Sequence, residues 1–168
     1  MVTLGAGNNQ YALAYMDYDL NYAAAGSFTD FGSVLGGVPA GITYELDDPN
    51  TSGIFADFAA NNLLNANNVS TPLGVNDPNG PCCDVSWALG VNGINVPTGQ
   101  TATVTFVISS TDPGGFRLQQ TNQSSGESIY LSESVKINGG GGGGIPEPAS
   151  LLLLGSGLAG LLAFRRVR

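Results

Sequence analysis

Residues 101–108 read Thr-Ala-Thr-Val-Thr-Phe-Val-Ile, and this stretch decides the fold class. Ala102, Val104, Phe106 and Ile108 alternate with threonines over most of its length, which is typical of a strand with one apolar face and one polar face. Turn-forming residues lie on both sides, Pro-Thr-Gly before the stretch and Asp-Pro-Gly-Gly after it. The stretch therefore predicts a half-buried strand of an antiparallel sheet.

Three neighbouring segments extend this pattern. The apolar face of residues 85–91 consists of Val85, Trp87, Leu89 and Val91. Residues 116–120 lie between two turns and predict a short strand. One face of the segment 128–137 carries Ile129, Leu131, Glu133, Val135 and Ile137. Four strands joined by short turns predict an antiparallel meander.

The first half of the chain supplies further strands. Residues 11–16 carry their larger side chains at odd positions, residues 42–46 alternate again, and residues 27–31 predict a short strand. Residues 54–64 predict a short helix or an irregular strand, since asparagines are poor helix formers. Two stretches rich in glycine, proline or asparagine are expected to be loops, 32–41 and 65–81. Residues 1–138 are thus predicted to form one all-β domain, an antiparallel β-sandwich of jelly-roll or immunoglobulin-like type.

Charge is scarce and almost entirely acidic in this predicted domain. Before Ile145 the chain has two basic residues, Arg117 and Lys136, against 12 acidic ones, a formal net charge of −10. Such a surface repels phosphates and lacks the basic patch that nucleic acid binding requires. The hydrophobic content of 42% is too high for a disordered chain. The composition indicates an exported β domain that does not bind nucleic acid.

The sequence contains no histidine. Its absence excludes Ser-His-Asp and Cys-His catalytic machinery, and every histidine-ligated zinc or copper site, from the chain as given. We expect a protein that is not an enzyme and has no cofactor.

The C-terminal part has a distinct organisation. Residues 139–144 are six glycines, which predict a flexible linker. Residues 145–148 read Ile-Pro-Glu-Pro, so a helix can begin only after Pro148. The next 16 residues, 149–164, are uncharged and make a helix about 24 Å long, a marginal membrane anchor. The sequence Arg-Arg-Val-Arg at 165–168 follows, and these arginines are expected in the cytoplasm.

These parts resemble the PEP-CTERM sorting signal of exported proteins from Gram-negative bacteria that make extracellular polysaccharide. In that family exosortase, a cysteine-dependent enzyme of the inner membrane, recognises the signal, which is cleaved near the Pro-Glu-Pro motif. The resemblance covers residues 145–168 and implies a transient inner-membrane intermediate, then the cell surface or the extracellular matrix, with extracellular polysaccharide as a partner. It assigns recognition to Pro146, Glu147 and Pro148, the membrane helix to Leu151, Leu152, Leu153, Leu154, Gly155, Gly157, Leu158, Gly160, Leu161, Leu162 and Phe164, and the basic stop to Arg165, Arg166 and Arg168. The alternative is an ordinary C-terminal membrane helix with incidental prolines.

Residues 1–9 have neither the basic region nor the apolar run of a signal peptide. Because cytoplasmic arginines place everything before Ile145 across the membrane, we expect the sequence to start inside the mature domain, through truncation or a misassigned start codon. Three segments of the predicted domain are also similar to domains that often precede PEP-CTERM tails and mostly lack an assigned activity, 84–90, 102–106 and 125–130.

Cys82 and Cys83 are adjacent. Adjacent cysteines close only a strained eight-membered ring, so a local disulfide, free thiols and bonds to another chain all stay open. In an oxidising periplasm we expect the pair to be oxidised and to form a structural link rather than a redox site.

Acidic residues form three clusters in turns, and calcium binds to oxygen ligands of this kind. The candidate calcium ligands are Asp17, Asp19, Asp47, Asp48 and Asp77. None of the clusters has the spacing of an EF-hand, so solvated turns are the favoured interpretation.

Aromatic residues suggest a sugar-stacking platform, with packing inside the fold as the default interpretation. They are Tyr15, Tyr18, Tyr22, Tyr44 and Trp87. The leading hypothesis is a non-enzymatic exported surface or matrix protein. A calcium-dependent carbohydrate-binding module, anchored by the C-terminal helix, is the alternative, and a hydrolase with two converging carboxylates is a third hypothesis.

Overall fold

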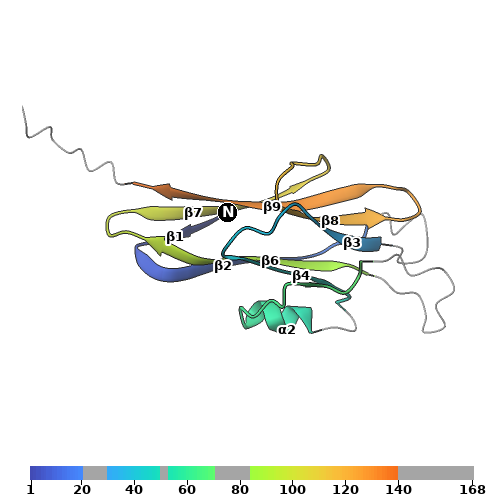
Figure 1. Ribbon diagram of the computed structural model, residues 1–168, viewed down its shortest axis with the longest axis horizontal. Helices are drawn as coiled ribbons and strands as arrows, with labels where there is room; N and C mark the ends of the chain where they lie inside the picture. Colours follow the sequence, from blue (N-terminus) through green and yellow to red (C-terminus); the bar gives the residue numbers. More distant parts are fainter. Residues whose placement is uncertain (21–29, 50–52, 71–83, 140–168) are drawn as a thin grey trace, which may run out of the picture. The chain divides into compact units, whose positions relative to one another are not determined.

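Two sheets pack against each other in the computed structural model, which describes residues 1–20, 30–49, 53–70 and 84–139 (Figure 1). The first sheet has the strand order β1-β7-β9-β8-β3, and the second has the order β2-β6-β4-β5. All pairings are antiparallel except that of β4 with β5. The strands are β1 (Val2–Leu4), β2 (Gly7–Asp17), β3 (Asp30–Leu35), β4 (Ile42–Asp47), β5 (Ala66–Asn67), β6 (Ser86–Val96), β7 (Thr101–Ser109), β8 (Arg117–Asn122) and β9 (Ser128–Asn138). Strands make up 57% of the described residues, which confirms the prediction of a mostly β structure.

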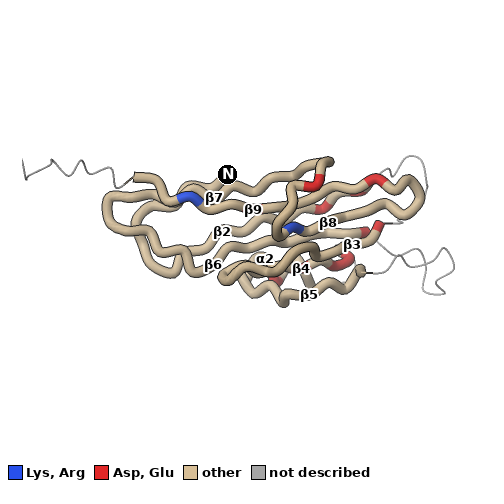
Figure 2. Tube along the Cα trace, turned by 45° about the horizontal axis from the view of Figure 1, so that its top comes forward, with Lys and Arg blue, Asp and Glu red and all other residues tan. Residues whose placement is uncertain are grey.

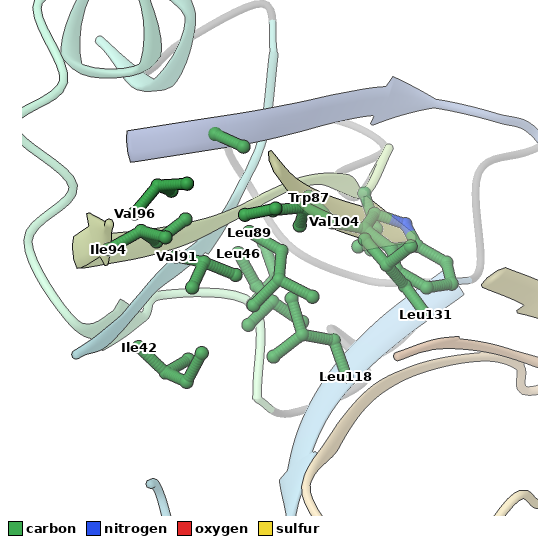
Figure 3. Packing of buried hydrophobic residues seen from close by; sticks show 14 residues of the cluster. Ile42, Leu46, Trp87, Leu89, Val91, Ile94, Val96, Val104, Leu118 and Leu131 are labelled. Carbon is green, nitrogen blue, oxygen red and sulfur yellow. The ribbon is translucent and has the colours of Figure 1, made fainter. Parts of the chain in front are cut away.

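The core lies between the two sheets, and β6 contributes more buried residues to it than any other strand. The predicted inward residues of β6 are all buried in this cluster, and Trp87 and Leu89 are fully inaccessible. Leu46 from β4 faces Val104, Leu118 and Leu131 from the first sheet across the same core (Figure 3). Gly93 has a φ of 70°, and beyond it the inward positions change from odd to even, at Ile94 and Val96.

The predicted meander is wrong, although its four strands exist. β6 pairs with β2 and β4 in the second sheet, and β7 pairs with β9 rather than with β8. The reason is burial. β6 is buried on both faces from Ser86 to Val91, so it takes a central place in the second sheet instead of an outer place beside β7. Of the predicted turns, the one between β8 and β9 joins neighbouring strands.

The first strand of the second sheet, β2, packs side chains on both faces of that sheet, with Met16 against the main core. Ala12 is buried in the main core, while Leu13 and Tyr15 pack on the opposite face, against a second cluster formed by Ile54, Leu63 and Ala88. Ile54 begins a short helix, α2 (Ile54–Ala59), which lies on that outer face (Figure 1). This confirms the helical option for the start of residues 54–64.

Glu45 holds the chain that follows α2. Its side chain is 1% exposed, and its Oε2 accepts a hydrogen bond from the backbone N–H of Leu64 at 3.1 Å. Burial raises the pKa of this carboxyl, more than the Leu64 hydrogen bond lowers it.

Both predicted loops contain strand residues and need correction. β3 begins at Asp30 and occupies the first part of the stretch 32–41, because Gly32 allows a close approach: a Cβ there would lie 2.6 Å from Leu46 Cδ2 and 3.2 Å from Val69 Cγ2. In the stretch 65–81, β5 pairs with β4, and Val69 is buried in the core.

The far ends of two strands are less buried than their alternation predicts. Ile108 is 56% exposed, and Val135 and Ile137 are each 42% exposed, although their partners in register include the buried Leu131, Val104 and Ala102. β1 pairs with residues 102–104 only, and β8 pairs with residues 128–131 only, so both β7 and β9 extend beyond their outer neighbours.

The predicted linker, Pro-Glu-Pro motif, membrane helix and basic stop, together with Cys82 and Cys83, lie outside the described residues, apart from Gly139. Among the residues that are described, no helix has the length and apolar character needed to cross a bilayer.

Candidate functional site

Acidic residues converge at one end of the second sheet. β2 ends at Asp17 and β4 ends at Asp47, and both residues are in register with Ser86 at the start of the central strand β6. Figure 2 shows acidic positions around this end, near β3 and β4. The first two predicted calcium clusters, which are 30 residues apart in sequence, therefore lie at the same end of the fold.

Asp84 completes this acidic end, and sequence reasoning missed it. Burial raises the pKa of Asp84 to about 7, with further contributions from the charges of Asp17 and Asp19, a hydrogen bond with Asp19 and the charge of Asp48. Its Oδ1 is buried without a hydrogen-bond partner among the described residues. The pKa of Asp17 is also raised, first by burial and then by Asp19 and Asp48. Asp84 therefore changes its protonation state near neutral pH.

The acidic end does not form a recognisable metal site. Within the described ranges, no group of three or more Asp, Glu or Cys side chains is placed to hold a metal ion. Asp47 also has structural partners, since its Oδ1 accepts from the N–H of Asp48 at 2.8 Å and its Oδ2 accepts from Asn68 Nδ2 at 2.6 Å. The third predicted cluster, around Asp77, lies outside the described residues.

A buried polar network lies next to the acidic end, in the space between the sheets. Gln120 from β8 is inaccessible, and its Nε2 donates to Asp30 Oδ2 at 2.7 Å and to the carbonyl of Tyr18 at 2.6 Å. Its Oε1 accepts from Trp87 Nε1 at 2.7 Å. Every polar atom of the Gln120 side chain therefore has a partner.

Asn122 closes the same network. Its Nδ2 donates to Asp30 Oδ1 at 2.7 Å and to the carbonyl of Leu20 at 3.0 Å, and its Oδ1 accepts from the N–H groups of Ser124 and Ser125. Burial raises the pKa of Asp30, although hydrogen bonds from Gln120, Leu20 and Asn122 lower it. The network ties the end of the segment 1–20 to β3 and β8.

The predicted sugar-stacking residues do not form one platform. Trp87 is fully buried and hydrogen-bonded to Gln120, and Tyr44 packs against Phe116 with ring centroids 6.0 Å apart. Tyr15 lies on the opposite face of the second sheet from Trp87, beneath α2, and Tyr18 is 54% exposed. Packing within the fold thus accounts for Trp87 and Tyr44, while Tyr22 lies outside the described residues.

A different aromatic cluster forms on the outer face, and the sequence did not indicate it. Tyr15 meets Phe55 edge-on and Phe58 at a tilt, each with ring centroids 5.5 Å apart, and the two phenylalanines are 6.1 Å apart. Phe55 is 63% exposed. The Tyr15 hydroxyl is hydrogen-bonded to Ser86. Burial raises the pKa of this hydroxyl, more than the Ser86 hydrogen bond lowers it. Tyr15 and Phe58 also pack against the buried residues Ile54, Leu63 and Ala88, whereas Phe55 lies at the exposed margin of the cluster.

Comparison with known proteins identifies only the C-terminal segment. A family model described as the PEP-CTERM protein-sorting motif matches residues 144–167. No curated protein and no solved structure matches the chain. The motif confirms the resemblance found in the sequence and implies sorting by exosortase, a membrane protein, toward the cell surface or extracellular space. The chain is therefore an exported protein that carries a PEP-CTERM protein-sorting motif at residues 144–167.

Proposed function

We propose that this chain is a non-enzymatic surface or extracellular-matrix protein, which exosortase releases by cleavage near residues 146–148. The observation that carries this proposal is the sorting motif at residues 144–167. Pro146, Glu147 and Pro148 form the recognition element, and a proline after Glu147 disfavours helical backbone at that residue.

The remaining parts of the tail have complementary roles. The apolar run 149–164 is a transient anchor in the inner membrane, and the arginines at 165, 166 and 168 keep its end in the cytoplasm. The six glycines give the enzyme access to the motif while the β domain stays folded.

The β domain is the cargo of this tail. Its two packed sheets suit a structural or binding role outside the cell, and its acidic character keeps it soluble. No histidine-based catalysis is open to it.

The test is mass spectrometry of the C-terminus in cell-surface and medium fractions, from cells with and without exosortase. We expect a terminus near residues 146–148 that disappears when exosortase is absent. Glu147→Gln should reduce the processed form at least about tenfold, while Glu127→Gln, which makes the same change in the β domain, should not. An intact Arg168 terminus confined to the inner membrane would show a plain membrane-anchored domain instead.

The calcium-dependent carbohydrate-binding alternative stays a prediction. Saturable stabilisation of the full chain by millimolar calcium would favour it, because a ligand that binds only the folded state raises the melting temperature. An unchanged melting temperature would count against it.

A further inference from the structure

A short helical segment covers part of the outer face of the second sheet. We refer to residues 53–64, which comprise α2 and the turn after it, as the cover. α2 contacts β2, β4 and β6 on that face (Figure 1). Ile54 and Leu63 of the cover are buried in one cluster with Ala88 of β6, and Tyr15 from β2 packs against the same cluster. The cover therefore seals an apolar patch of the sheet.

A buried carboxyl lies in this part of the sheet. Glu45 on β4 is in register with Ala88, and Ala88 is in register with Tyr15, so the three residues form one row across the outer face. The side chain of Glu45 is inaccessible to water. A carboxyl that is buried among apolar groups is costly to ionise unless nearby cations or several hydrogen bonds compensate.

The surroundings of Glu45 favour its neutral form. Burial raises the pKa of this carboxyl most, and the charges of Asp57 on α2 and Asp47 on β4 raise it further. The backbone N–H of Leu64, the last residue of the cover, donates to Glu45 Oε2 and lowers the pKa by less. The register partners of Glu45 on β6 and β5 are both alanines. In the described part of the chain, the charged groups that act on Glu45 are thus both acidic.

The cover depends on its contact with the sheet. α2 has six residues, and Gly53 at its start provides no side-chain hydrogen bond to cap it. A helix this short and uncapped is unstable in isolation. The bond between Leu64 and Glu45 and the burial of Ile54 and Leu63 therefore decide whether the cover stays closed.

We propose that Glu45 is a proton-operated latch for the cover. In its neutral form the carboxyl stays buried beside Ala88 and accepts the N–H of Leu64, so the cover stays closed. In its ionised form the carboxylate is stabilised by water, which reaches it when the cover lifts. Opening bares Leu13, Tyr15 and Ala88, so the apolar surface that the domain presents increases with pH.

The direction of this switch follows from proton linkage. The closed cover raises the pKa of Glu45 above its ordinary value of 4.5, so the closed state binds the proton more tightly than the open state. This stabilisation of the closed state is fully present below the ordinary pKa. It is lost as pH rises through the raised pKa of the closed state.

Hydrogen exchange of the Leu64 amide tests the proposal, because this N–H donates to Glu45. The full chain is measured in mild non-ionic detergent at about pH 4 and about pH 7, and the rates are corrected for the intrinsic pH dependence of exchange. We expect the protection of Leu64 to fall at least about threefold between the two pH values. Constant protection in the wild type would overturn the proposal.

Two variants separate the latch from other carboxyls. Glu45→Gln keeps an oxygen for the Leu64 N–H but does not titrate, so the fall in protection should disappear. Glu133→Gln is the matched control and should keep the fall, because Glu133 is also a glutamate whose pKa burial raises, on β9 of the other sheet. A fall that survives Glu45→Gln would contradict the proposal.

Asp57→Asn tests the same latch from the side of the cover, without altering Glu45, and decides the matter if Glu45→Gln does not fold. It removes a negative charge that opposes the ionisation of Glu45. The fall in Leu64 protection between the two pH values should therefore become smaller without vanishing. An unchanged fall would show that Glu45 does not control the cover.

Discussion

Replacing Gln120 with methionine, a side chain of similar size, should strongly lower the free energy of unfolding. The substitution removes three hydrogen bonds, to Trp87 Nε1, to Asp30 Oδ2 and to the carbonyl of Tyr18. Asp30 Oδ2 retains the N–H of Leu20, but the fully buried Trp87 loses the partner of its indole N–H. Each buried polar group left unpaired costs about 1–3 kcal/mol.

The indole N–H and the Tyr18 carbonyl together give a loss of about 2–6 kcal/mol in unfolding free energy. This is a large part of the roughly 5–15 kcal/mol that stabilises a typical domain. The assay is urea unfolding of the full chain in mild detergent, followed by circular dichroism. Gln119→Met is the control on the same strand, since Gln119 faces outward and bonds to Ser128 Oγ. We expect it to cost less than about 1 kcal/mol.

A double-mutant cycle isolates the Trp87 contact. Trp87→Phe removes the indole donor. The double variant with Gln120→Met should therefore lose about 1–2 kcal/mol less unfolding free energy than the sum of the losses of the two single variants. Additive losses, or a Gln120→Met variant as stable as Gln119→Met, would refute the view that the network carries this stability.

Three further predictions address other parts of the fold. The pKa of Asp84 is about 7 in the folded state and near 4 in the unfolded state, so the folded state binds the proton more tightly and the free energy of unfolding should rise as pH falls from about 8 to 5. In Asp84→Asn this rise should be smaller by about 1–2 kcal/mol after solvent screening, as measured by urea unfolding at pH 8 and at pH 5. Gly32→Ala should cost about 1–3 kcal/mol, measured by thermal unfolding, because its Cβ would crowd Leu46, whereas Gly37→Ala, with no atom within 4 Å, should be nearly neutral. Ile54→Ala should lower the free energy of urea unfolding by about 2–5 kcal/mol, because Ile54 is the fully buried residue of α2. Phe55 is 63% exposed, so an equal loss from Phe55→Ala would contradict this reasoning.

Local alternation predicted individual strands well and their arrangement poorly. Residues 101–108 and 85–91 form strands with the expected inner faces over most of their length, because a two-residue period reports directly which side of a strand is buried. The meander was wrong because alternation carries no information about which strands are neighbours. The burial of both faces of β6 is only weakly indicated in the sequence, by the small uncharged residues Ala88 and Gly90 on its second face.

The candidate sites show the same contrast. The sorting motif is contiguous, so sequence alone identified it. The acidic end depends on residues brought together by register, and Asp84 has no local feature that separates it from an ordinary residue before a strand. The Asp30 network was missed for a similar reason, since glutamine and asparagine on an alternating strand look like a solvent-facing side.

The position of β9 determines how the domain responds to mechanical load. Any pull on the C-terminal tail enters the folded domain at Asn138, the last residue of β9. That strand is in register with nine residues of β7 on one side and four of β8 on the other. A force along β9 therefore shears many hydrogen bonds at once instead of opening them one after another. A pull on the tail is therefore resisted by the pairing of β9 with both of its neighbours together.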